Sequence, residues 1–359
     1  MLALTVEPGR AGTLAVTEVA DPAPGEAELL IDALAVGVCG TDKEIARGDY
    51  GWAPPGQLRL VLGHESLGRV RSAPPGSRFA PGDLVVGVVR RPDPVPCGAC
   101  AHGEFDMCRN GDYTERGIKS RHGYASESWA VEPDYAVRLD PSLGLVGVLM
   151  EPTSVVAKAW EQVERIGNRA WFEPRTALVT GAGPIGLLGA LLGVQRGLDV
   201  HVLDQVTDGI KPRLVSELGA TYHSGAVDDV LARLRPDVVI EATGASAVVF
   251  AALAGTAPYG IVCLTGVSPT GRQISVDGGL INRELVLEND AVVGSVNANL
   301  RHYAAAADAL AAADRDWLEG LITRRLPLAR FAEAFGPDPA GDDVKVALTL
   351  GDDGSGDSR

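Results

Sequence analysis

Three side chains with metal-binding chemistry occur in the first half of the chain: Cys39, His64 and Glu151. Thiolate, imidazole and carboxylate groups are ligands that proteins use for zinc, and three protein ligands leave a fourth position open for a reacting group. Glu65, next to His64, is a further candidate. Each residue also has an ordinary explanation, since a lone cysteine is often a core residue and Glu151 could begin a surface helix. The set predicts a catalytic metal centre if the fold brings these residues together.

A second group of metal-type residues follows in the same half of the chain. Cys97, Cys100 and Cys108 have the spacing of one lobe of a structural zinc site, which requires four ligands. Asp93 and His102 are the nearby candidates for the fourth ligand. The alternative interpretation is a degenerate lobe that holds no metal.

A glycine-rich turn in the second half offers a different chemistry. It lies between an apolar, strand-like run and an apolar, helix-like run, and the free N–H groups at such a helix N-terminus suit a pyrophosphate. Asp204 ends the next predicted strand, where a carboxylate binds the ribose hydroxyls of NAD and repels the 2′-phosphate of NADP. The turn therefore predicts NAD binding, although Lys211 and Arg213 leave NADP open and Asp204 could instead cap a turn. The predicted cofactor-binding residues of the turn are Gly181, Gly183, Pro184, Ile185 and Gly186.

Two patterns of secondary structure position these groups. Up to about residue 150, short alternating runs separated by Gly and Pro predict many short strands. From about Glu151, strand-like and helix-like runs alternate, which predicts a doubly wound parallel sheet. Because the strand-like run 344–350 cannot form a domain alone, we expect it to pair with the first half. The expected strands of the parallel sheet are 177–180, 200–203, 238–241, 261–264 and 292–296, with helices near 185–196, 211–218, 228–234, 247–254 and 301–312.

Length and charge restrict the class of protein. A chain of 359 residues is expected to form two domains, and its net charge of −15 argues against nucleic-acid and anionic-membrane partners. No apolar run approaches the roughly 20 residues of a membrane span. The N-terminal sequence has no signal-peptide features, and an odd number of cysteines argues against a disulfide framework. These features predict a cytoplasmic protein. Residues 351–359, rich in Gly, Asp and Ser, are expected to be disordered.

Several segments, taken in order, carry a family resemblance. GVCGTD, GHE, GIKSRHGYASE, MEPTSV and GAGPIG resemble the medium-chain zinc-dependent alcohol dehydrogenases, and more closely their glucose (aldose) 1-dehydrogenase branch. The resemblance runs from about residue 36 to about residue 350. It implies a GroES-like β domain carrying zinc, formed by residues 1–155 and 300–359, and a Rossmann dinucleotide-binding domain at 156–299. It also implies a homodimer or homotetramer.

The resemblance implies roles for particular residues. Cys39, His64 and Glu151 match the catalytic zinc ligands, Glu65 can enter the coordination sphere, and Thr41 matches a hydroxyl that relays the substrate proton. Glu115 and Asn297 match partners of the sugar, and the lining of the cofactor is matched by Thr243, Gly244, Leu264, Gly266, Val267 and Val296. The implied reaction is zinc-assisted transfer of hydride from a sugar hydroxyl to NAD, at C1 of an aldose such as glucose, giving the lactone.

Three positions depart from the pattern of that family. Pro94 stands where the first of four structural cysteines would fall, and Pro74 replaces a glycine or alanine of the zinc signature. Val155 stands where some sugar-specific members carry a carboxylate. One alternative is therefore the same chemistry on a polyol, a cyclitol or a sugar-derived secondary alcohol. Another is a zinc-free reductase or a non-catalytic NAD-binding relative.

Overall fold

The computed structural model describes residues 1–269, 271, 273–338 and 341–351. The chain divides into two compact units, one formed by Met1–Glu151 with the chain from Ala298 onward and the other by Pro152–Asn297. Residues 352–359, which make up most of the segment expected to be disordered, lie outside the described part.

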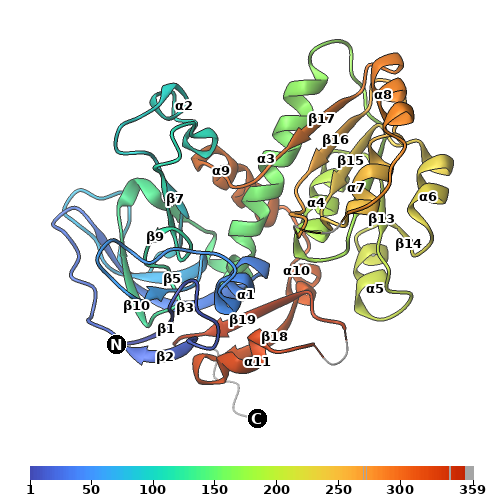
Figure 1. The fold of residues 1–359 in the computed structure, drawn as a ribbon. Helices are drawn as coiled ribbons and strands as arrows, with labels where there is room; N and C mark the ends of the chain where they lie inside the picture. The colour runs from blue at the N-terminus through green and yellow to red at the C-terminus, as the bar shows by residue number, and fades with distance from the viewer. Residues whose placement is uncertain (270, 272, 339–340, 352–359) are drawn as a thin grey trace. The chain divides into compact units, whose positions relative to one another are not determined.

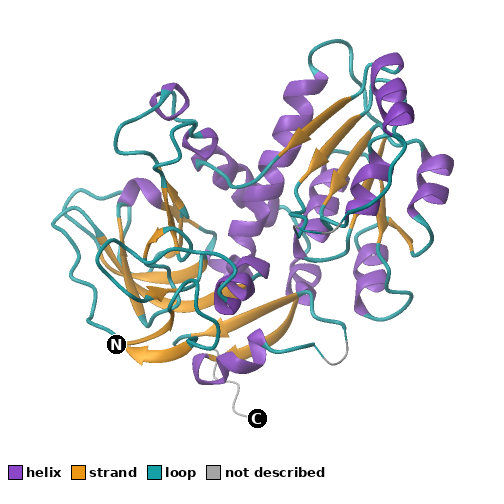
Figure 2. Ribbon diagram, viewed as in Figure 1, coloured by secondary structure: helices purple, strands orange, loops and turns teal. Residues whose placement is uncertain are grey.

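The first unit is built mainly from short strands (Figures 1 and 2). Its largest sheet has the order β11-β6-β5-β3-β19-β18, and β10 also pairs with β3. The strands of this sheet are β3 (Leu29–Val38), β5 (Glu65–Ser72), β6 (Leu84–Gly87), β10 (Ser128–Val131), β11 (Ala136–Arg138), β18 (Ile322–Pro327) and β19 (Lys345–Thr349). Two smaller sheets contain β1 (Leu2–Val6), β2 (Ala15–Glu18) and β4 (Leu60–Val61), and β7 (Arg90–Arg91), β8 (Thr114–Arg116) and β9 (Ser120–Arg121).

Strand β3 is the centre of this unit because both of its faces contact a hydrophobic core. Leu29, Ile31 and Ala33 alternate along one face and belong to a cluster that includes Trp129. Further along the strand, Val36 and Val38 belong to a separate cluster. The second half of β3 is therefore buried on both faces, and this half leads directly to Cys39.

The predicted return of the C-terminal strand to the first half is confirmed. β19 pairs antiparallel with β3, with Ala347 opposite Gly37, and parallel with β18. The helices of this unit are α1 (Gly40–Arg47), α2 (Gly98–Ala101), α9 (Leu300–Ala311), α10 (Arg315–Leu321) and α11 (Phe331–Phe335), with short 3-10 turns at Phe105–Met107, Pro133–Tyr135, Pro141–Leu149 and Leu328–Arg330.

The second unit is a parallel sheet with the strand order β14-β13-β12-β15-β16-β17 and helices on both of its faces (Figure 1). The chain order therefore reverses between β12 and β15, which is where ligands bind in open α/β sheets. The strands are β12 (Thr176–Thr180), β13 (Asp199–Leu203), β14 (Thr221–His223), β15 (Val238–Glu241), β16 (Ile261–Leu264) and β17 (Ala291–Gly294). The helices are α3 (Met150–Gly167), α4 (Pro184–Gln195), α5 (Ile210–Glu217), α6 (Val227–Leu234), α7 (Ser246–Ala252) and α8 (Gly278–Leu287).

The predicted fold class, a GroES-like β unit with a doubly wound parallel-sheet unit, is confirmed. Sequence patterns did not predict β14 or α8, because β14 is a short, half-buried edge strand and α8 has no buried face. From the sequence we expected no segment with the length and composition of a membrane span, but the helical stretch Pro141–Gly167 meets both criteria. It is long and apolar enough by composition, but 72% of the relevant window is buried inside the protein, as expected of a core helix.

Candidate active site

The first unit brings three of the predicted metal ligands into one group. Donor atoms of Cys39, His64 and Glu65 all lie within 4.8 Å of one another, and Cys39 Sγ is 3.0 Å from His64 Nε2. Cys39 follows the buried end of β3, His64 directly precedes β5, and Glu65 is the first residue of β5. A thiol, an imidazole and a carboxylate that face a common point fit a zinc ion by their chemistry.

Glu65 reaches this group because glycine stands opposite it on β3. In the register of the sheet Gly37 pairs with Glu65, and a Cβ added to Gly37 would lie 1.9 Å from Glu65 Oε2. The Glu65 side chain thus crosses β3 toward β19, where Lys345 Nζ contacts both carboxylate oxygens at 2.6 and 2.7 Å. Burial disfavours the charged form of Lys345, but Glu65, Cys39 and Glu151 together outweigh this effect, and the pKa of the ammonium is raised.

Asp42 connects the metal group to helix α1. Its Oδ2 accepts a hydrogen bond from the Cys39 backbone N–H at 3.0 Å, as in a capping box, and its Oδ1 lies 3.3 Å from His64 Nδ1. A carboxylate at Nδ1 favours the tautomer whose Nε2 lone pair faces Cys39. The same residue therefore caps the helix and places its second carboxylate oxygen beside the imidazole.

Glu151, also predicted as a zinc ligand, lies outside this close group but near it. Burial raises the pKa of its carboxyl to about 7, and the charges of His64, Glu65 and Lys345 also act on it. The predicted ligand set thus remains a prediction, with Glu65 closest to the two other donors in the described structure. Thr41, the predicted proton relay, lies in the first turn of α1, between Cys39 and Asp42.

Glu115, the predicted sugar partner, lies on β8 and is buried. Its Oε1 accepts hydrogen bonds from Arg90 Nε and a terminal Arg90 nitrogen at 3.2 and 3.0 Å. Arg90 in turn lies 3.7 Å from the centre of the Tyr113 ring. This arrangement fixes one carboxylate oxygen and balances its charge. Arg90 was not predicted, because nothing in the local sequence indicates that β7 pairs with β8.

The three clustered cysteines also come together, although their fourth ligand does not. The sulfur atoms of Cys97, Cys100 and Cys108 lie within 4.8 Å of one another. His102 is exposed, and its Nδ1 lies 2.7 Å from the carbonyl of Gly98 at the other end of α2. Asp93 is buried; its Oδ1 accepts from the Val95 N–H, and its Oδ2 has no hydrogen-bond partner among the described residues. Asp93 is therefore the better candidate for the fourth ligand, which stays a prediction.

In the second unit the glycine turn has the close backbone approach that its sequence predicts. Gly181 has a φ of 92°, and a Cβ on Gly186 would lie 1.7 Å from the Gly181 carbonyl oxygen. Gly183 precedes α4, which starts with Pro184 and Ile185. The turn and the N-terminus of α4 therefore present backbone N–H groups at the edge where the strand order reverses.

Asp204 follows β13 beside this turn and has several partners. Its Oδ2 accepts from the Ala182 N–H at 2.6 Å, and its Oδ1 accepts from the Gln205 N–H at 2.7 Å. Lys211 Nζ lies 3.7 Å from Oδ2. Asp204 thus holds the glycine turn through Oδ2 and the segment directly after β13 through Oδ1, and the Lys211 ammonium places a positive charge beside it.

A buried glutamate that the sequence reasoning missed organises the neighbouring loops. Glu241 ends β15 and is fully buried; its Oε1 accepts from the Thr243 N–H at 2.8 Å and from the Gly244 N–H at 3.1 Å. Gly244 has a φ of 64°, and a Cβ on Gly266 would lie 2.1 Å from its nitrogen. The main-chain carbonyl of Glu241 accepts from the N–H groups of Thr265 and Gly266, at 2.8 and 3.0 Å. The predicted cofactor-lining segments after β15 and β16 are therefore both held by this residue, the first by its carboxylate and the second by its carbonyl oxygen.

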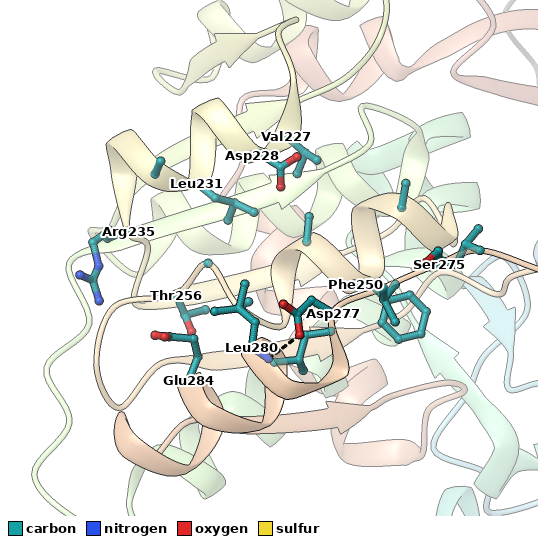
Figure 3. A pocket seen from close by; sticks show the side chains of 18 residues that line it. Val227, Asp228, Leu231, Arg235, Phe250, Thr256, Ser275, Asp277, Leu280 and Glu284 are labelled. Atoms are coloured by element: carbon teal, nitrogen blue, oxygen red, sulfur yellow. Dashed lines mark hydrogen bonds between the residues drawn. The ribbon is translucent and has the colours of Figure 1, made fainter.

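The other predicted residues of the second unit lie at the ends of strands. Leu264 ends β16, and Val267 and Val296 are exposed, at 79% and 62%. Asn297 has a left-handed φ of 67°, and the preceding carbonyl accepts a hydrogen bond from the buried Lys158 ammonium at 3.0 Å. A separate groove of about 680 Å³ between α6, α7 and α8 (Figure 3) is lined by none of the predicted site residues, so the chemistry is not expected there.

A β unit that gathers zinc-type donors and a parallel-sheet unit that carries a glycine turn are the two parts of a dinucleotide-dependent alcohol dehydrogenase. The family model of the alcohol dehydrogenase GroES-like domain matches residues 25–141, and that of the glucose dehydrogenase C-terminus matches residues 144–350. The chain thus belongs to the glucose dehydrogenase family and is an enzyme.

Individual relatives match over nearly the whole chain. The chain is 41% identical to a glucose 1-dehydrogenase of Methanocella arvoryzae, over 98% of this chain and 100% of that protein. It is 42% identical to a glucose 1-dehydrogenase of Thermoproteus tenax, over 98% and 99%. A solved structure of Haloferax mediterranei glucose dehydrogenase in complex with NADP, Zn and gluconolactone has a TM-score of 0.89 at 35% identity, covering 97% of this chain and 99% of that one.

Proposed function

We propose that this protein oxidises an aldose such as glucose at C1 to the lactone and transfers the hydride to NAD or NADP. The observation that carries the proposal is the group formed by Cys39, His64 and Glu65 in a chain of the glucose dehydrogenase family. The Haloferax mediterranei relative, solved with NADP, Zn and gluconolactone, supports the same substrate class.

The residues of the chain have distinct tasks in this reaction. Cys39 and His64, with Glu65 or Glu151, hold the zinc ion, while a carboxylate oxygen of Asp42 lies beside the imidazole. A zinc ion held by these residues would polarise a substrate hydroxyl and lower its pKa. Thr41, in the first turn of α1, takes the released proton toward solvent.

Recognition of a sugar requires buried polar partners for several hydroxyl groups. Glu115 is such a partner, since its carboxylate is buried and held by Arg90. Asn297 is the second, on a backbone fixed through the Lys158 ammonium. Val155, in place of a carboxylate, keeps open the polyol, cyclitol or secondary-alcohol alternative, in which the same residues act on another carbon.

The cofactor is NAD or NADP. The glycine turn supports pyrophosphate binding, and Asp204 supports binding of the ribose hydroxyls. The Lys211 ammonium lies 3.7 Å from Asp204 and could pair with a 2′-phosphate, so it supports binding of NADP as well as NAD.

A cofactor-reduction assay tests the proposal directly. Purified protein with one equivalent of zinc is given aldoses and polyols in parallel, with NAD and NADP, and NMR identifies the product. We expect glucose or another aldose to be oxidised to a lactone, and Cys39→Ser to reduce the rate at least 100-fold with loss of metal. Turnover of polyols but not aldoses would favour the alternative substrate class, and full activity of Cys39→Ser would contradict the zinc mechanism.

Assembly and location form a second part of the proposal. We infer a cytoplasmic homodimer or homotetramer, by family resemblance. Light scattering on the purified protein tests the assembly, because a monomer at micromolar concentration would contradict it. Metal analysis of the same sample separates one zinc ion per chain from two, and thus tests the cysteine lobe.

A further inference from the structure

Two aromatic side chains of the first unit form an exposed surface that has no part in the chemistry described above. Tyr50 and Trp52 lie in the loop after α1, and these residues are 41% and 49% exposed. Their ring centroids are 5.0 Å apart, and the ring planes are inclined at 74°. Single exposed aromatic residues are common on proteins, but two rings in contact form a continuous apolar surface, which favours a role in binding.

The backbone holds this pair of rings in place. Gly51, between them, has a φ of 95°, and a Cβ on it would lie 3.0 Å from Cγ1 of the buried Ile45. The Trp52 N–H donates to the Ile118 carbonyl at 2.9 Å, and the Trp52 carbonyl accepts from the Ser120 N–H at 3.0 Å. The loop is therefore packed against α1 and bonded to the turn after β8, so that a ligand would meet rings that are already positioned.

The turn after β8 begins at Glu115, the predicted sugar partner. The Glu115 carbonyl accepts from the N–H groups of Ile118 and Lys119, at 3.2 and 2.9 Å. The Glu115 N–H in turn donates to the Lys119 carbonyl at 2.8 Å. Trp52 thus pairs with the same turn whose first residue carries the buried carboxylate.

The charge of Glu115 also acts on Tyr50. Burial raises the pKa of the Tyr50 hydroxyl, and Glu115 and Tyr113 raise it further, whereas the guanidinium of Arg90 lowers it. Arg90 is the residue that donates to the Glu115 carboxylate. The buried carboxylate with its arginine and the exposed aromatic pair therefore lie within the range of electrostatic interaction, inside one unit.

A carboxylate and an aromatic ring recognise different parts of a sugar. The hydroxyl groups on the edge of a pyranose ring donate hydrogen bonds to a carboxylate. The faces of the pyranose carry C–H groups with a small positive partial charge, which suit the negative face of an aromatic ring and leave water when they pack against it. An open-chain polyol has similar hydroxyl groups but no flat C–H face.

We propose that Tyr50 and Trp52 determine substrate specificity by packing against the C–H face of a pyranose whose hydroxyl groups bind Glu115. This role rests on the proposed function and narrows it, because the aromatic pair selects a cyclic aldose over an open-chain polyol. The two parts of the surface are continuous through the backbone hydrogen bonds of Trp52. The rings that water covers in the free protein are the rings that the sugar covers.

Steady-state kinetics and tryptophan fluorescence test this role separately. The zinc-loaded protein is assayed with glucose at saturating cofactor, as wild type, Trp52→Ala and Trp52→Phe. Trp171→Ala is the matched control, because Trp171 is 83% exposed and belongs to the second unit. Without cofactor, glucose is titrated while the tryptophan fluorescence of the wild type and of Trp52→Phe is recorded. Sorbitol, an open-chain polyol, is titrated at the same concentrations for comparison.

We expect Trp52→Ala to raise KM for glucose about tenfold, with kcat and KM for the cofactor changed by less than about twofold. Trp52→Phe, which keeps an aromatic ring, should recover most of the lost affinity, and Trp171→Ala should behave as the wild type. Glucose but not sorbitol should change the fluorescence of the wild type, and this change should be absent from Trp52→Phe.

An unchanged KM for glucose in Trp52→Ala would overturn this role and leave the proposed function intact. Equal changes in kcat and in KM for the cofactor would also overturn it, because that pattern indicates a structural residue, as would an equal fluorescence effect of sorbitol. If Trp52→Ala does not fold, Tyr50→Ala serves in its place with the same kinetic expectations. A fluorescence change with glucose but no turnover of any aldose would support the sugar surface and reject the proposed reaction, whereas the absence of both would overturn both.

Discussion

Replacing Lys345 by methionine should destabilise the protein in a way that zinc reverses. Lys345 and Glu65 are each about 2% exposed, and both carboxylate oxygens contact the ammonium. Removing one partner of a buried ion pair costs about 3–5 kcal/mol, because the other charge stays buried without compensation. At about 2–4 °C per kcal/mol for units of this size, Tm in the presence of a chelator should fall by roughly 6–20 °C.

Zinc should restore much of this loss. The cation supplies the positive charge that Glu65 has lost, so added zinc should raise the Tm of Lys345→Met more than that of the wild type. The measurement is circular dichroism during heating, first with EDTA and then with one equivalent of zinc after removal of the chelator.

A lysine outside the site provides the control. Lys43 is half-buried on α1, and its side chain makes no hydrogen bond or ion pair within the described part of the chain, so Lys43→Met should change neither value by more than about 2 °C. Unfolding of Lys345→Met at the wild-type temperature with EDTA, or equal stabilisation of Lys345→Met and the wild type by zinc, would contradict the predicted role of the ion pair.

Three other substitutions test separate parts of the description. Gly37→Ala places a Cβ 1.9 Å from the present position of Glu65 Oε2, so zinc affinity measured by competitive titration should fall about 10–100-fold; unchanged affinity would exclude Glu65 as a ligand. Lys211→Met should raise KM for NADP about tenfold and leave KM for NAD nearly unchanged, whereas equal changes would separate Lys211 from the 2′-phosphate. Glu132→Gln tests the pKa of the Glu132 carboxyl. Burial raises this pKa, but the hydrogen bond and charge of Arg91 act in the opposite direction, and the resulting pKa is about 2. Because the Glu132 side chain is 34% exposed, its loss should cost only about 1–2 kcal/mol at pH 7, in urea unfolding. A carboxyl group whose pKa is lower in the folded protein than in the unfolded chain stabilises the fold at a pH above its unfolded pKa, and this stabilisation is lost as the pH falls. The difference in unfolding free energy between Glu132→Gln and the wild type should therefore shrink between pH 4.5 and pH 2. A constant difference would contradict the ion pair.

The sequence was most informative where function depends on neighbouring residues. The glycine turn could be predicted because its tight approach, Gly186 against Gly181, is encoded within six positions. Strands β15 and β16 were predicted with the observed bounds, since buried parallel strands form continuous apolar runs. The cysteine lobe could be predicted for the same local reason.

The residues that support the site were missed because their roles depend on pairing between distant segments. Lys345 becomes a partner of Glu65 only through the register of three strands, and Gly37 is necessary only because of that register. Glu241 looks like an ordinary strand end until its carboxylate is seen to accept N–H groups from the following loop. Asp42 lies inside the GVCGTD motif, but its contact with His64 could not be predicted from spacing.

The long separation between Glu65 and Lys345 has a consequence for biosynthesis. The two residues are 280 positions apart, so at about 5–20 residues per second the ribosome needs tens of seconds to deliver the lysine. Cys39, Asp42, His64 and Glu65 all emerge long before it. During that interval a nascent chain offers Glu65 to a metal ion without competition from the ammonium. On the proposed ligand set that includes Glu65, metal loading should therefore be more efficient during translation than on the finished protein, where the cation would compete with Lys345.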